Sequence, residues 1–186
     1  MNKKSIFDKN LKIIRPDINL STFNYFISEI MQYYLSNSRN LDDELEKLGE
    51  NIGPRLLELM VFREKQFKHE IKHVEMLKFI HSTVWKSLFG KTADSLEKAK
   101  DSEVEYMIKD YNPSFMRYIS EYTHYSPASF MVGVIKGILN SAGFEAAVTY
   151  QTLSFEEKNG ERKSLYPQTV WIIEFASSVI MRENFQ

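Results

Sequence analysis

The hydrophobic pattern of this chain changes near Lys100, and that change limits the folds open to it. Before Lys100, apolar residues recur every three or four positions, as on one face of an α-helix. After it come short aromatic and β-branched runs separated by turn residues, which is typical of strands. With 186 residues and 43% hydrophobic residues, the chain is predicted to form one globular domain of helices packed on a sheet.

Helical spacing predicts five helices. The third is expected to end at Gly90 and the fourth just before Gly143, because glycine favours the position after a helix. Asn19, in the sequence Asn-Leu-Ser, is expected to cap the first helix rather than carry a glycan. Gly53 and Pro54 predict a break in the second helix. The predicted helices are 20–36, 41–62, 66–89, 127–142 and 176–183.

Strand-like runs predict a small antiparallel sheet of about four strands. The first two runs flank the turn residues Asn112 and Pro113, and the last two flank the charged stretch 156–163, predicted to be an exposed hairpin loop. The expected order is ααα-ββ-α-ββ-α, a single α+β domain over residues 19–186 that follows a mobile N-terminus, residues 1–18. The four runs are 104–108, 115–119, 144–153 and 169–175.

Composition excludes several function classes. The formal net charge of −1 provides no overall field for nucleic acid, so we expect no nucleic-acid partner. The chain has no cysteine, which excludes disulfides, thiolate nucleophiles and thiolate metal sites. The sequence contains no run of 18 apolar residues, the length that a membrane-spanning helix requires. The basic start is not followed by the apolar stretch of a signal peptide.

The first helix carries more apolar surface than one core requires. With Phe26 and Tyr33 included, its apolar face spans roughly 200°, compared with about 100° for a helix that buries one stripe. An exposed apolar face of this width usually marks an interface with another protein. The candidate interface residues are Phe23, Phe26, Ile30, Tyr33 and Tyr34.

Two motifs suggest an enzyme but lack the rest of a site. His69, Glu70 and His73 match the H-E-x-x-H pattern of zinc hydrolases, in which two histidines bind the metal and the glutamate acts on its water. The sequence provides no third ligand at a recognised spacing, and a solvated helix face is the favoured interpretation. Gly90, Lys91 and Thr92 resemble the end of a phosphate-binding loop, but Trp85 occupies the place of its first glycine. We therefore expect no enzyme, metal or cofactor. A third motif concerns packing: Gly133 and Gly137, four positions apart, favour close helix packing.

Several short segments occur in an order that resembles one protein family. The longest is Trp-Lys-Ser-Leu-Phe-Gly-Lys-Thr-Ala-Asp, residues 85–94. Together the segments resemble the subunit-5 type of the small subunits of TRAPP, the transport protein particle, which belong to the Bet-three-like superfamily. The resemblance covers nearly the whole chain from Leu20. The other segments are 63–65, 128–130, 141–144, 173–175 and 179–183.

The resemblance implies helices on a small antiparallel sheet and pairing between related subunits through their first helices. It implies a non-catalytic scaffold subunit of a vesicle-tethering complex in transport between the endoplasmic reticulum and the Golgi. Nucleotide exchange on a Rab-type GTPase would then belong to the assembly. The implied partners are other TRAPP small subunits, as a heterodimer or, for the isolated chain, a homodimer. The implied location is cytoplasmic, peripheral to the membranes of the cis-Golgi and endoplasmic reticulum.

Some relatives carry a cysteine beside an acyl-binding channel, a property that this cysteine-free chain does not share. The chain also departs from the family pattern at Ser126 and Pro127 and in the stretch 156–163. Two alternatives remain open at this point. One is a small-ligand-binding domain with a hydrophobic pocket between sheet and helices, and the other is the zinc hydrolase built on His69, Glu70 and His73.

Overall fold

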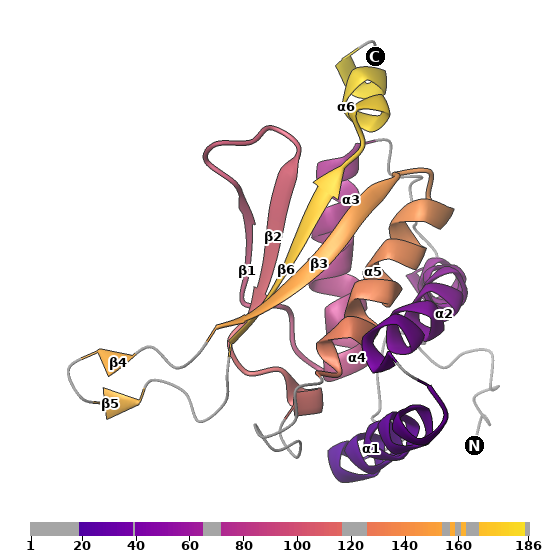
Figure 1. The fold of residues 1–186 in the computed structure, drawn as a ribbon. Helices are drawn as coiled ribbons and strands as arrows, with labels where there is room; N and C mark the ends of the chain where they lie inside the picture. The colour runs from indigo at the N-terminus through magenta and orange to yellow at the C-terminus, as the bar shows by residue number, and fades with distance from the viewer. Residues whose placement is uncertain are drawn as a thin grey trace, which may run out of the picture.

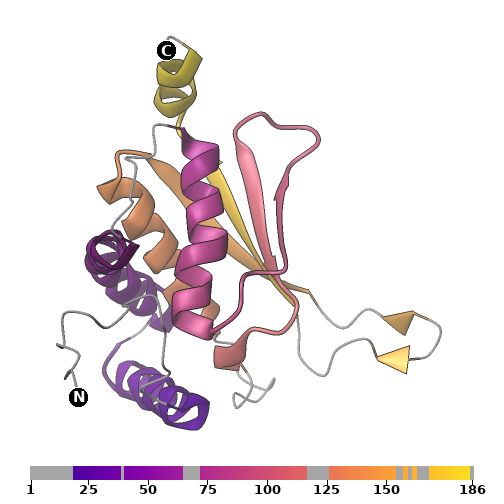
Figure 2. The same cartoon turned by 180° about the vertical axis from the view of Figure 1, so that it is seen from behind.

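The structure, a computed structural model, describes residues 19–38, 40–64, 72–116, 126–153, 157–158, 161–162 and 168–184. These residues form a four-stranded antiparallel sheet with helices on one of its faces. In Figure 1 the sheet stands in front of α3, and in Figure 2, seen from behind, α3 stands in front of the sheet. The predicted α+β class is therefore confirmed. The N-terminal segment 1–18, predicted to be mobile, lies outside the described residues.

The predicted helices are present, with some different boundaries. The side chain of Asn19 caps the first one, accepting a hydrogen bond of 2.8 Å from the amide of Thr22 as expected. A π-helical turn, η2 (Ile80–Val84), joins two helices into one continuous rod. Gly90 ends the rod with a φ of 74°, also as expected. The helices are α1 (Leu20–Asn37), α2 (Leu41–Glu64), α3 (His73–Phe79), α4 (Trp85–Phe89), α5 (Ala128–Ser141) and α6 (Ser177–Asn184).

The start of the third predicted helix was placed wrongly. Lys72 is extended, with φ −105° and ψ 135°, so the helix begins at His73 and not at residue 66. Residues 65–71 lie outside the described part of the chain. A carboxylate oxygen of Glu183 accepts a hydrogen bond from the backbone amide of His73, one of the amides at the N-terminus of α3 that have no partner within the helix. That contact joins residues 110 positions apart, which is why local spacing could not locate this boundary.

The predicted break at Gly53 was also wrong, because α2 continues through Gly53 and Pro54. Its two glycines face the two glycines of α5, and the helix backbones meet there. A Cβ atom added to Gly53 would lie 2.7 Å from the carbonyl oxygen of Val134, and one added to Gly133 would lie 1.9 Å from that of Glu46. This close packing along the pair stabilises α2 more than its weak local propensity destabilises it. The glycine pattern of the fourth predicted helix thus serves packing within the domain.

The sheet has the strand order β1-β2-β6-β3, and every neighbouring pair is antiparallel. A separate two-stranded hairpin, formed by β4 and β5, falls within the stretch predicted as a hairpin loop. The strands are β1 (Ser95–Lys98), β2 (Glu105–Asp110), β3 (Ala146–Leu153), β4 (Glu157–Lys158), β5 (Glu161–Arg162) and β6 (Gln168–Phe175).

One predicted strand was assigned to the wrong segment. The partner of β2 is the upstream strand β1, whereas Phe115 lies in a short 3-10 helix, η3 (Ser114–Met116). The remainder of that predicted run, 117–119, lies outside the described residues. β1 is a short edge strand with two charged residues, and an ion pair of 2.6 Å joins its Glu97 to Lys109 of β2. Such a strand has almost no hydrophobic alternation, so its sequence gives little signal.

The core lies between the sheet and the helices. Trp85 of α4 and Trp171 of β6 are both fully buried, and their ring centroids are 5.1 Å apart in an edge-to-face arrangement. Within the described ranges, none of the helices combines the length and the hydrophobicity that crossing a membrane requires.

Candidate functional site

Exposed apolar side chains concentrate on two neighbouring helices. Among the described residues, ten large hydrophobic side chains are exposed, and seven of them, four on α1 and three on α2, belong to this pair. α1 lies at the end of the molecule opposite to α6, with α2 beside it (Figures 1 and 2). A surface with this distribution has the character of a protein interface.

α1 presents two of the five predicted interface residues to solvent. Phe26 and Tyr33 are each 62% exposed, and because they are seven positions apart they lie on the same side of the helix. Phe23, Ile30 and Tyr34 are partly buried instead, packed against a small cluster formed by four buried side chains. The three side chains thus border the exposed strip. The cluster consists of Ile27, Met31, Leu41 and Leu45.

α2 also exposes apolar side chains, which were not predicted from the sequence. Ile52, Leu59 and Phe62 are 36%, 42% and 71% exposed. They occupy one side of α2, since they follow at intervals of seven and three residues. These intervals are visible in the sequence. Because a break was predicted at Gly53, however, the three residues were not assigned to one side of a single helix. Tyr25 and Leu35, 78% and 47% exposed on α1, also escaped prediction as exposed residues.

Charge is sparse on α1. Glu29 is the one charged residue among its 18. The centres of protein interfaces are depleted in charge and enriched in aromatic residues, as this helix is. The exposed strip of α1, formed by Phe26 and Tyr33, is therefore suited to docking against an apolar face of a partner protein.

The zinc hypothesis finds no support around His73. His69 and Glu70 lie outside the described residues, but the extended backbone at Lys72 interrupts the helix that would align His69 with His73. Nδ1 of His73 lies 2.7 Å from a carboxylate oxygen of Glu183, and Nε2 lies 2.9 Å from the hydroxyl of Tyr106. Both ring nitrogens therefore have protein partners. Within the described ranges, no three His, Cys, Asp or Glu side chains are grouped to hold a metal ion.

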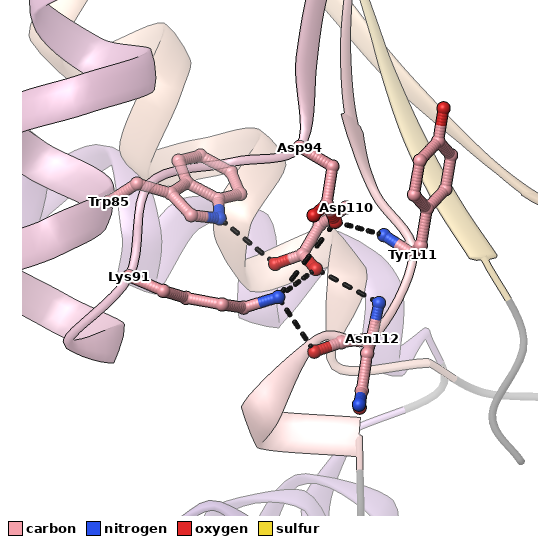
Figure 3. A network of polar contacts seen from close by, with 6 residues as sticks. All are labelled: Trp85, Lys91, Asp94, Asp110, Tyr111 and Asn112. Atoms are coloured by element: carbon pink, nitrogen blue, oxygen red, sulfur yellow. Dashed lines mark hydrogen bonds and ion pairs between the residues drawn. The ribbon is translucent and has the colours of Figure 1, made fainter. Parts of the chain in front are cut away.

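The segment 85–94 forms a polar network around a fully buried carboxylate (Figure 3). Trp85 donates its indole N–H to Oδ2 of Asp110 at 3.0 Å, and Lys91 donates to Oδ1 at 2.5 Å. Lys91 also donates to the carbonyl oxygen of Asn112 at 3.0 Å, and Asp94 accepts from the amide of Tyr111 at 2.7 Å. A buried carboxylate requires such charge-assisted partners. The side chains of this segment therefore hold the turn that follows β2.

A hollow of about 270 Å³ opens beside α1 in the described part of the chain. The described residues that line it are Ser21, Asn24, Tyr25 and Ser28, all from α1. This hollow is partly polar and does not correspond to the hydrophobic pocket between sheet and helices that the ligand-binding alternative requires.

Comparison with known proteins agrees with this geometry. The family model described as transport protein particle (TRAPP) component matches residues 23–176. "Trafficking protein particle complex subunit 5" of Dictyostelium discoideum is 44% identical over 184 residues, covering 96% of each chain. The human protein of the same name is 35% identical over 153 residues, covering 79% of this chain and 81% of its own.

A solved structure shares the fold. It is a trafficking protein particle complex subunit 3 from Naegleria fowleri, described as covalently bound to palmitic acid. Its TM-score is 0.69 at 15% sequence identity, over 86% of this chain and 96% of that one. The fold, the extent of the family match and the identity to subunit-5 proteins lead to one conclusion: this chain belongs to the TRAPP component family, in its subunit-5 branch, whose members are non-catalytic components of a vesicle-tethering complex.

Proposed function

We propose that this chain is a scaffold subunit of a TRAPP complex in transport between the endoplasmic reticulum and the Golgi, and that it pairs with another TRAPP small subunit through α1. The observation that carries the proposal is the exposure of Phe26 and Tyr33 on a helix with one charged residue. Isolated in water, such a face is unfavourable, and burial against a second apolar helix face removes it from solvent.

In this proposal the chain provides binding surface for other subunits and fixes their arrangement. Nucleotide exchange on a Rab-type GTPase requires the whole assembly. Its place is cytoplasmic, peripheral to the membranes of the cis-Golgi and endoplasmic reticulum, with membrane association through the complex. The relative from Naegleria fowleri is covalently bound to palmitic acid; this chain contains no cysteine and so could not hold an acyl chain through a thioester.

Co-expression with each of the other TRAPP small subunits, followed by size-exclusion chromatography with light scattering, tests the pairing. The variant Phe26→Lys/Tyr33→Lys places two charges on the exposed strip without touching the buried side of α1. Loss of two aromatic interface anchors typically costs about 2 kcal/mol or more, so the dissociation constant should rise at least about 30-fold.

Met181→Lys is the matched control, because Met181 is 60% exposed on α6 at the other end of the molecule. It should pair as the unmodified chain does. Two results would refute the proposal: a chain that stays monomeric with every small subunit, or a Phe26→Lys/Tyr33→Lys variant that pairs with unchanged affinity.

A further inference from the structure

One buried polar side chain connects α1 to the rest of the domain. Asn24 is 1% exposed, and its amide nitrogen donates to the carbonyl oxygens of Leu20 at 2.9 Å and Ser114 at 3.3 Å. Leu20 belongs to α1 itself, whereas Ser114 is the first residue of η3. Because a buried amide needs its partners, the bond to Ser114 restricts where α1 can sit on the domain.

η3 is held in place from its other side by the segment 85–94. Ser114 is separated by Pro113 alone from the turn at Tyr111 and Asn112. Lys91, Asp94 and Asp110 hold that turn through the bonds drawn in Figure 3. The amide of Asn112 adds a further bond to Oδ1 of Asp110 at 3.0 Å. The turn thus has fixed partners at three successive residues, 110–112.

Aromatic packing fixes the apolar side of η3. Phe115 is 3% exposed, and its ring centroid lies 5.3 Å from that of Phe89 and 6.2 Å from that of Trp171. Phe89 and Trp85, whose rings are 5.6 Å apart, both belong to the segment 85–94. This segment therefore holds η3 by apolar contacts and the turn before η3 by polar contacts, and η3 in turn contacts α1.

We propose that Lys91 and Asp110 are positioning residues for partner binding: they fix the turn before η3, and through Ser114 and Asn24 the turn orients α1 and its exposed residues Phe26 and Tyr33. The proposal rests on the pairing through α1 stated above. Asn24 is buried on the opposite side from the exposed strip, so it acts on a partner only through the placement of α1. A helix held in its binding orientation loses less conformational freedom on association.

Lys91→Met tests the coupling in the full chain. Lys91 is 36% exposed, so the substitution removes its bonds to Asp110 and Asn112 without opening the core. Hydrogen–deuterium exchange should become faster over residues 20–37. Coupling through a chain of contacts typically amounts to about 0.5–2 kcal/mol, so the dissociation constant for the small subunit should rise between about 2-fold and 30-fold. Lys91→Arg keeps the charge and the donors and should restore both properties.

Asn24→Ala breaks the same connection at its other end and should produce the same two changes while the turn stays intact. Lys109→Met is the matched control, since it breaks an ion pair of 2.6 Å with Glu97 on the sheet and should leave both measurements unchanged. Unchanged exchange over 20–37 in both Lys91→Met and Asn24→Ala would overturn the inference, and so would equal effects of Lys109→Met. If no small subunit binds even the unmodified chain, the proposed function fails, while the exchange measurement still decides whether the network orients α1.

Discussion

Because the backbones of α2 and α5 meet so closely, a small substitution at their contact should lower the free energy of unfolding. Gly133→Ala adds a single methyl group, and its Cβ atom would lie 1.9 Å from the carbonyl oxygen of Glu46 and 2.8 Å from the backbone nitrogen of Glu50. Both are backbone atoms of α2, so no side chain can rotate away. Ordinary contact begins near 3.4 Å, so the helices would have to separate by about 1.5 Å.

Two opposing effects set the size of the change. Alanine is favoured over glycine inside a helix by about 1 kcal/mol. Overpacking a close contact costs about 1–3 kcal/mol, and the rigid backbone on both sides places this site at the upper end of that range. The net loss in the free energy of unfolding is therefore about 2 kcal/mol, which lowers Tm by about 4–8 °C for a chain of this length.

Urea unfolding followed by circular dichroism measures the loss, and a size series identifies its cause. Gly133→Leu should cost much more than Gly133→Ala, because every added carbon meets α2. The control is Gly90, which has a φ of 74° and no atom within 4 Å of an added Cβ. Gly90→Ala should cost about 1 kcal/mol through backbone strain, and Gly90→Leu should cost nearly the same. A Gly133→Ala variant as stable as the unmodified chain would refute the close backbone approach.

Two further predictions concern the contacts of α6 and α3. Burial, with Glu183 and Glu103 nearby, raises the pKa of the Tyr106 hydroxyl above its usual 10.0. The unfolded chain then releases this proton first, so stability should fall as the pH rises above about 10, and Tyr106→Phe should lose less over that range in urea titrations; equal losses would contradict the assignment. Glu183→Ala leaves the amide of His73 without its acceptor and should lower the free energy of unfolding by roughly 1–3 kcal/mol, with faster hydrogen exchange over 177–184. Glu183→Gln keeps an acceptor and should lose less; an equal loss would assign the effect to charge alone.

Local sequence signals located most of the elements. Helical periodicity identified α1 and α5, and the glycines at 90 and 143 have the positive φ angles expected just after helices. The strand run near Tyr106 corresponds to β2, and the last two runs correspond to β3 and β6. These signals succeed because they depend on neighbours within a few residues.

The candidate site was predicted in part. The first helix was predicted to be an interface because its apolar face is wider than one core requires, and Phe26 and Tyr33 are indeed exposed. Whether they contact a partner remains a prediction. Ile52 and Phe62 were missed because Gly53 and Pro54 indicated a break, while the continuity of α2 depends on glycines of α5 about 80 positions away.

The sequence alone determined the class of the domain, the sites of most helices and strands, and the family, because each depends on periodicity, on turn residues or on short ordered motifs. Only the tertiary structure decided which segment pairs with β2, where α3 begins and what the segment 85–94 does. Each of these depends on contacts between distant residues: Glu97 with Lys109, His73 with Glu183, and Lys91 with Asp110. The type of a residue indicates that its side chain needs a hydrogen-bond or ion-pair partner once it is buried. Which distant residue becomes that partner is decided only by the folded chain.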